Sequence, residues 1–286
     1  MTWIETHSAS FEARHEAADS DDVRLVLDRL EQFRSDLSGR FERLPEDVAV
    51  VIHGSPAMLA VAHPWLELAR LAASPASRRY FGGWFTSGEI HVLAPKLLEE
   101  RASKVAGSAE TLRLAPLHEY AHLVIGANNP KLPPPFSPRS FRNYLRWAWL
   151  CEGAATWLAG QTPYLAPAIV SRMRKGRAPS LPPSARDAML LGGSIFDLLA
   201  EGEGPDACVT LICNLEAAGP QAAIERAFAR PLAEITDDWR RYLAELTAPE
   251  PTTTLTDSLP SEQTAPMQPE DARAERRRRR EARRTG

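Results

Sequence analysis

Apolar residues near the start of the chain recur at helical spacing. Over residues 20–41 they return every three or four positions, which predicts an amphipathic helix that ends between Gly39 and Pro45. The β-branched run DVAVVIHG follows and predicts a buried strand, Val48–His53. Looser alternation over residues 3–16 indicates a strand or hairpin arm before that helix. The first part of the chain therefore combines strands with helices.

Later segments change from this mixed pattern to a helical one. A helix over residues 56–73 is expected, and the glycine-containing segment YFGGWFTSGEIHVLAP predicts a bend and a second strand, Glu89–Leu93. Beyond residue 110 the predicted elements are all helices, over residues 110–126, 144–159, 185–200, 205–217, 220–228 and 232–246. The pattern predicts an α+β fold with a small N-terminal mixed sheet. We divide the chain into residues 1–126, a helical part over 127–248, and a tail over 249–286.

Composition and charge exclude several classes of protein. The hydrophobic fraction of 44% and charged fraction of 25% are typical of a folded globular protein. A net charge of -3 gives no general attraction to nucleic acid or anionic membranes. The first residues lack the basic and apolar regions of a secretory signal, and no apolar stretch approaches the roughly 20 residues of a membrane helix. We therefore expect a cytoplasmic protein without membrane contact.

The three cysteines predict no covalent framework. Cys151, Cys208 and Cys213 are odd in number and form no C-x-x-C pair, which argues against disulfides and against a thiolate zinc site. We expect each to be a small buried apolar side chain.

The tail has a different composition from the rest of the chain. From Pro249 onward Pro, Thr, Ser, Gln and Glu predominate, so disorder is expected. Residues 273–284 contain eight arginines, a density that can contact phosphates. Interleaved Glu275 and Glu281, and the lack of aromatic residues for base stacking, favour a solvated tail instead. Binding to nucleic acid is thus expected only through this cluster, if at all.

One short motif carries candidate chemistry. The segment APLHEYAHLVIG has His118 and His122 four residues apart, with Glu119 directly after the first. Residues four apart share a face of an α-helix, so both imidazoles can reach one metal ion. Neutral imidazole suits Zn²⁺, and a catalytic zinc takes three protein ligands and leaves a fourth position for water. Glu119 is turned partly toward the site, near enough to handle that water without being a ligand.

The third ligand distinguishes the classes of zinc site. A third histidine shortly after His122 is excluded, because no histidine follows it anywhere in the chain. A carboxylate is therefore expected. Glu152 lies in the apolar, aromatic-rich segment RWAWLCEGAATWLAG, where burying an unpaired carboxylate is costly and a metal ion offsets that cost.

These motifs resemble a known family. HEYAH followed 30 residues later by W-L-x-E-G-x-A, with Glu152 as its acidic residue, resembles the gluzincin zinc metallopeptidases and most closely their peptidase MA-like relatives. The resemblance covers residues 3–246 and is strongest over 85–160. It implies a thermolysin-like zincin catalytic domain, Zn²⁺ held by His118, His122 and Glu152, and Glu119 as the general base. It also implies a peptide or protein substrate, for which the strand within residues 88–93 would offer a free edge.

One part of the family pattern is displaced. Gluzincins usually stabilise the oxyanion with a downstream His or Tyr, yet the corresponding segment here reads DAMLLGGSIF, with Met189 near the expected place. Tyr144, Tyr164 or an arginine within residues 127–142 is a candidate substitute. Thr156, one helical turn beyond Glu152, is a candidate polar neighbour of the ligands. The remaining histidines considered are interpreted as structural or exposed: His53, His63 and His91.

Three functional hypotheses remain open from the sequence. The first is an active zinc metallopeptidase. The second is a zinc-binding protein of the same fold that is catalytically silent, because the oxyanion donor is unassigned. The third is a module that binds nucleic acid or an acidic partner through the arginine-rich tail.

Overall fold

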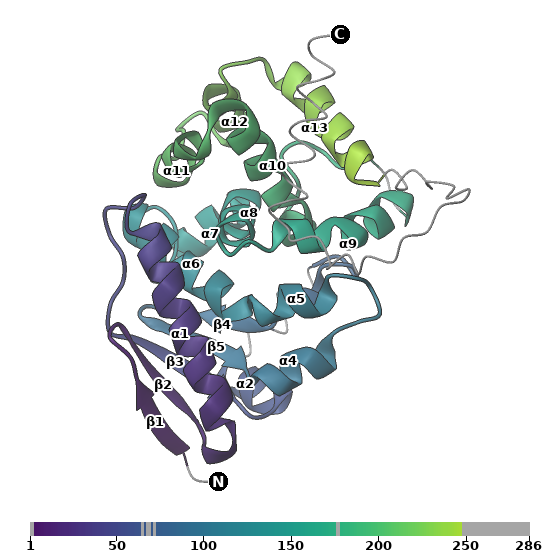
Figure 1. Cartoon of the computed structure of the whole chain (residues 1–286). Coiled ribbons are helices and arrows are strands. Elements are labelled where there is room, and N and C mark those ends of the chain that lie inside the picture. Colours follow the sequence, from purple (N-terminus) through teal and green to yellow (C-terminus); the bar gives the residue numbers. More distant parts are fainter. Residues whose placement is uncertain (1–2, 64–65, 67–69, 71–72, 176–177, 248–286) are drawn as a thin grey trace, which may run out of the picture. The chain divides into compact units, whose positions relative to one another are not determined.

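A computed structural model describes residues 3–63, 66, 70, 73–175 and 178–247 of the chain (Figure 1). Residues 1–247 form one compact unit, and residues 248–286 are a second unit that lies outside the described residues. The expectations for the tail and its arginine cluster therefore lie outside the described residues as well. The division of the compact unit at residue 126 stays a prediction.

A mixed five-stranded sheet forms the N-terminal part of the compact unit. Its strands run in the order β1-β2-β3-β5-β4, with β2, β3 and β5 parallel and both outer strands antiparallel to their neighbours. The strands are β1 (Trp3–His7), β2 (Phe11–Glu16), β3 (Val48–His53), β4 (Gly83–Phe85) and β5 (Glu89–Leu93). The hairpin arm and the two strands predicted at 48–53 and 89–93 are confirmed.

The free edge of this sheet differs from the expected one. The sequence assigns the edge to residues 88–93, but β5 has β3 on one side and β4 on the other. That prediction was wrong because β4 was not recognised: it is three residues long and begins with a glycine, which gives almost no alternating pattern. In the described part of the chain, β4 is the outermost strand on this side.

Helices α1 and α6 pack on one face of the sheet, and α2 packs on the other. Successive side chains of a strand point to opposite faces, so Ile90 and Val92 face the main core while His91 between them faces the side of α2. The apolar stripe of α1 (Ser20–Leu37) is buried in that main core, from Val23 to Leu37. The sheet thus separates α6 from α2.

The rest of the compact unit is helical, which confirms the α+β class. The remaining helices are α2 (Pro56–Ala62), α4 (Pro95–Arg101), α5 (Ser108–Arg113), α6 (Ala115–Asn128), α7 (Pro138–Arg146), α8 (Ala148–Leu158), α9 (Thr162–Lys175), α10 (Ala188–Glu203), α11 (Pro205–Cys213), α12 (Pro220–Phe228) and α13 (Leu232–Thr247). Among the described residues, none of the helices is both long and apolar enough to span a bilayer.

Several predicted helix boundaries were wrong for identifiable reasons. The single helix expected over 110–126 is two helices, because Pro116 has no N–H to continue the earlier one and instead lies in the first turn of α6. The helix expected over 144–159 is divided at Trp147, which is not helical. The helix expected over 56–73 is described as α2 only to Ala62; most of its later residues lie outside the described part.

Helix α8 is central to the helical part. It packs against α10 on one side and against α6 on the other, which brings the two segments that carry the candidate motifs together. The core around it is apolar and includes Trp149, Phe196 and Trp239. Cys151 and Cys208 are buried there as free thiols, as expected, and Cys213 is partly buried.

Candidate metal centre

Helix α6 presents both histidines of the motif to one point. His118 and His122 are one helical turn apart, and their Nε2 atoms are 3.2 Å from each other. Both side chains are buried, with 4% and 3% of their surface exposed. Because α6 is apolar around the motif, it packs between the sheet and α8 and holds the imidazoles inside the protein.

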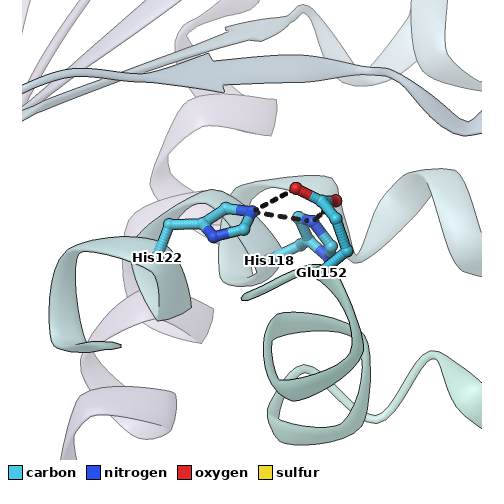
Figure 2. Close-up of side chains that lie close together, drawn as sticks. All are labelled: His118, His122 and Glu152. Carbon is cyan, nitrogen blue, oxygen red and sulfur yellow. Dashed lines mark hydrogen bonds and ion pairs between the residues drawn. The ribbon is translucent and has the colours of Figure 1, made fainter. Parts of the chain in front are cut away.

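Glu152 reaches the same point from α8 (Figure 2). Its Oε2 is 3.4 Å from Nε2 of His118, and its Oε1 is 3.5 Å from Nε2 of His122. Ligands about 2.0–2.1 Å from a tetrahedral zinc ion lie roughly 3.3 Å from one another, close to all three separations. In the described part of the chain this is the one group of three or more metal-binding side chains whose ligand atoms all lie within 4.8 Å. Two imidazoles and a carboxylate are also a donor set that suits zinc.

The charges within this group are strongly coupled. Burial opposes a charge on Glu152, but the nearby His122 and His118 and a hydrogen bond from Tyr144 lower the pKa of Glu152 to about 2. Burial likewise opposes a charge on His118, yet its contacts with Glu152 raise the pKa of His118 above its ordinary value. Burial and repulsion from His118 lower the pKa of His122 to about 3, although the charge of Glu152 opposes this.

Glu119 lies beside the group without being part of it. It is 7% exposed, and burial raises its pKa to about 8, with the charge of His118 opposing this and that of Glu152 adding to it. Edge strand β4 passes directly over it: a Cβ on Gly83 would lie 2.7 Å from Cγ of Glu119 and 2.8 Å from its Oε1. Glycine is needed at residue 83 because a side chain there would displace the carboxylate.

Gln161 is a contact of the site that the sequence analysis missed. Its Oε1 lies 2.8 Å from Nδ1 of His118, and its Nε2 donates to the carbonyl of Thr111 over 2.8 Å. Because Nε2 of the amide is committed to Thr111, the amide oxygen faces His118, which leaves Nε2 of His118 free to bind a metal. No periodic or motif signal marks Gln161, which lies between α8 and α9 and meets His118 only through the tertiary fold.

The three other candidate residues have different surroundings. Tyr144 donates its hydroxyl to Oε1 of Glu152 over 2.6 Å, so this residue is at the site. The hydroxyl of Thr156 donates instead to the carbonyl of Met189 on α10 over 3.5 Å. The backbone N–H of Tyr164 donates to the carbonyl of Gln161. The structure therefore brings Tyr144 to the candidate ligands, while Thr156 and Tyr164 bond to backbone carbonyls.

An aromatic wall adjoins the candidate ligands. The ring of Phe85 stacks on His122 with centroids 4.2 Å apart and an interplanar angle of 17°. Phe136, from the proline-rich segment after α6, contacts both Phe85 and Trp84, with centroids 5.2 and 5.7 Å away. Phe85 thus restricts the orientation of His122, and the three rings make this side of the centre apolar.

Comparisons with known proteins add little. No protein-family model matches the chain, and no curated protein does. Among solved structures, the M1 zinc metallopeptidase from Deinococcus radiodurans matches with a TM-score of 0.42 and 12% sequence identity. The match covers 87% of this chain and 52% of the peptidase, so the chain spans about half of that protein's length. A similarity of this degree does not establish a shared fold or activity.

Proposed function

We propose that the chain is a zinc-dependent metallopeptidase of the gluzincin type, with a thermolysin-like catalytic domain. The observation that carries the proposal is the buried group of His118, His122 and Glu152, whose donor atoms lie 3.2 to 3.5 Å apart. Buried charges are costly unless they are paired or bind a metal, and this group contains two imidazoles and two carboxylates when Glu119 is counted. A metal centre accounts for their shared burial.

The proposed reaction divides the work between the ion and the protein. A zinc ion held by the three ligands would lower the pKa of water toward about 7 and polarise the scissile carbonyl. Glu119, buried beside the three proposed ligands, takes the proton of the attacking water and passes it to the leaving amine. Gln161 holds His118 in the orientation that presents Nε2.

A peptide substrate is supported by the position of β4. This strand is the outermost on its side of the described sheet, Gly83 lies against Glu119, and Phe85 stacks on His122. An extended peptide pairing with β4 would pass beside both the proposed base and a proposed ligand. The aromatic wall would favour an apolar substrate side chain next to the scissile bond.

The test combines metal analysis with peptide hydrolysis. We expect one zinc per chain at the proposed site, lost in His122→Ala and in Glu152→Ala. Glu119→Gln should keep this zinc and lose hydrolysis of a mixed peptide library, while Glu100→Gln, at an exposed position on α4, should keep both. Full zinc content in Glu152→Ala would contradict the ligand assignment, and hydrolysis at the original rate by Glu119→Gln would contradict the proposed base.

A catalytically silent zinc protein is the second candidate. It is favoured by one observation: the hydroxyl of Tyr144, the candidate oxyanion donor nearest the ligands, is already bonded to Glu152. Loss of an oxyanion donor typically costs about 10²- to 10³-fold in rate. Bound zinc together with no turnover of any library peptide would favour this second candidate over the first.

A further inference from the structure

Three further histidines meet on the opposite face of the sheet from α6. His53 is the last residue of β3, His63 directly follows α2, and His91 is the middle residue of β5. The rings of His63 and His91 have centroids 4.0 Å apart, and those of His53 and His91 are 5.4 Å apart. Three separate elements thus contribute to one cluster of imidazoles.

Most of this cluster is buried, and several of its nitrogens make no hydrogen bond. His53 is 4% exposed and His91 is 8% exposed. Nδ1 of His53, Nε2 of His91 and Nε2 of His63 are buried and make no hydrogen bond within the described structure. Burial of an unsatisfied nitrogen is unfavourable, and an ion bound by Nε2 of His63 would give that atom a partner. Burial and repulsion among the rings lower the pKa of His53 to about 4 and that of His91 to about 3, so these two are neutral near pH 7.

The geometry of two of the rings already matches that of metal ligands. Nε2 of His53 and Nδ1 of His91 are 3.1 Å apart, close to the 3.2 Å between the two imidazoles of the α6 centre. One proton lies between the two nitrogens in a neutral pair, and a cation can take its place. Oε2 of Glu89 is 3.4 Å from Nε2 of His91, on the far side of the ring, and supplies a neighbouring negative charge.

The third ring must turn to complete the site. The donor atoms of the three histidines do not all lie within 4.8 Å of one another, as those of the α6 centre do. His63 is only partly buried and directly follows the last residue of α2, so binding of one ion by all three rings requires the His63 ring to turn toward the other two. Its ring already contacts His91 edge to face.

We propose that His53, His63 and His91 bind a second divalent metal ion of the imidazole-preferring kind, such as Zn²⁺. The site lies on the α2 side of the sheet, away from Glu119 on α6. It ties the end of α2 to β3 and β5. The inference is independent of catalysis at the first centre.

The test measures zinc content in chains from which the first centre has been removed. The full chain is stripped with a chelator, exposed to Zn²⁺ and analysed for bound metal, with circular dichroism to confirm folding. We expect two zinc ions per unmodified chain and one in the double variant His118→Ala/His122→Ala. Adding His91→Gln to that double variant should remove the remaining ion, whereas adding His7→Gln, at an exposed position of β1, should not.

Each outcome decides one proposal or the other. If the folded double variant binds no zinc, or if His91→Gln leaves its zinc unchanged, the second site is contradicted. If His91→Gln does not fold, the partly exposed His63→Gln replaces it and should lower zinc binding in the same background. Two zinc ions that both survive His118→Ala/His122→Ala would contradict the proposed metallopeptidase, and loss of one of them in His91→Gln would leave the second site supported.

Discussion

Gly153 and Gly192 meet backbone to backbone where α8 crosses α10. A Cβ on Gly153 would lie 2.5 Å from the carbonyl carbon of Gly192, and one on Gly192 would lie 2.5 Å from the carbonyl oxygen of Trp149. The two helices can approach this closely only because neither residue has a side chain. Since Glu152 precedes Gly153, this crossing sets how far the proposed carboxylate ligand extends toward α6.

We expect Gly192→Ala to destabilise the fold and weaken zinc binding together. The added methyl group has to push α8 away from α10, at a cost of about 1–3 kcal/mol or more in the free energy of unfolding. Gly202→Ala on the same helix is the control, because nothing lies within 4 Å of its Cβ. Alanine there should be neutral or stabilise by about 0.5–1 kcal/mol. Urea unfolding and zinc titration of both variants check this. Equal stability and equal zinc affinity of the two variants would contradict the proposed role of the α8–α10 crossing.

The contact of Gln161 with His118 predicts a measurable effect on metal affinity. Gln161→Leu removes the acceptor for Nδ1 of His118 and leaves the Thr111 carbonyl without its donor. Loss of such an orienting contact typically weakens metal binding about 10- to 100-fold. Competition with a chromogenic chelator gives the zinc Kd, and Gln221→Leu at an exposed position of α12 is the matched control. An unchanged Kd in Gln161→Leu would show that the contact does not orient a ligand.

The zinc Kd also distinguishes the roles of Tyr144 and Tyr164. Tyr144→Phe removes the donor 2.6 Å from Oε1 of Glu152, so we expect zinc affinity to fall about 10-fold. In the described part of the chain the hydroxyl of Tyr164 makes no hydrogen bond to a candidate ligand, so Tyr164→Phe should leave the affinity unchanged. If Tyr144→Phe instead lowers only kcat, by about 10²-fold or more, with zinc affinity intact, then its hydroxyl acts on the oxyanion and not on Glu152.

The long periodic elements were predictable from sequence, and the short or tertiary ones were not. The apolar stripe of α1 and the β-branched run of β3 each contain many residues of one pattern, and a pattern of that length rarely arises by chance. Helices α4 and α9 were missed: α4 is only seven residues long, and α9 has Pro167 within it, which usually argues against a helix.

The candidate site shows the same division. His118, Glu119 and His122 are local in sequence, so helix geometry alone places the two imidazoles together. Glu152 could be assigned only from the cost of burying a carboxylate and from a family resemblance, because no local sequence pattern links α8 to α6. Gln161 contacts His118 across 43 positions of sequence through an ordinary amide, which no pattern of a single sequence marks.

The last prediction concerns stability against pH, through Glu31 on α1. Its Oε1 accepts a hydrogen bond from the hydroxyl of Ser8 over 2.7 Å and one from the N–H of Ser10 over 2.6 Å, joining α1 to the β1–β2 turn. Burial opposes its charge, but these bonds and the nearby Arg34 lower the pKa of Glu31 below its ordinary value of 4.5. A carboxylate whose pKa is lower in the folded state stabilises fully above its unfolded value and progressively less as the pH falls through the folded one.

Glu31→Gln should therefore lose about 1 kcal/mol of unfolding free energy at pH 7, a figure reduced for solvent screening at this partly exposed position. The difference from the unmodified chain should shrink as the pH falls below 4.5, because the unmodified carboxyl is then protonated as well. Urea unfolding at several pH values measures this, with the exposed Glu42→Gln as the control that should show no difference at any of them. If the destabilisation by Glu31→Gln stays constant down to pH 3, the charge of Glu31 does not account for its contribution to stability.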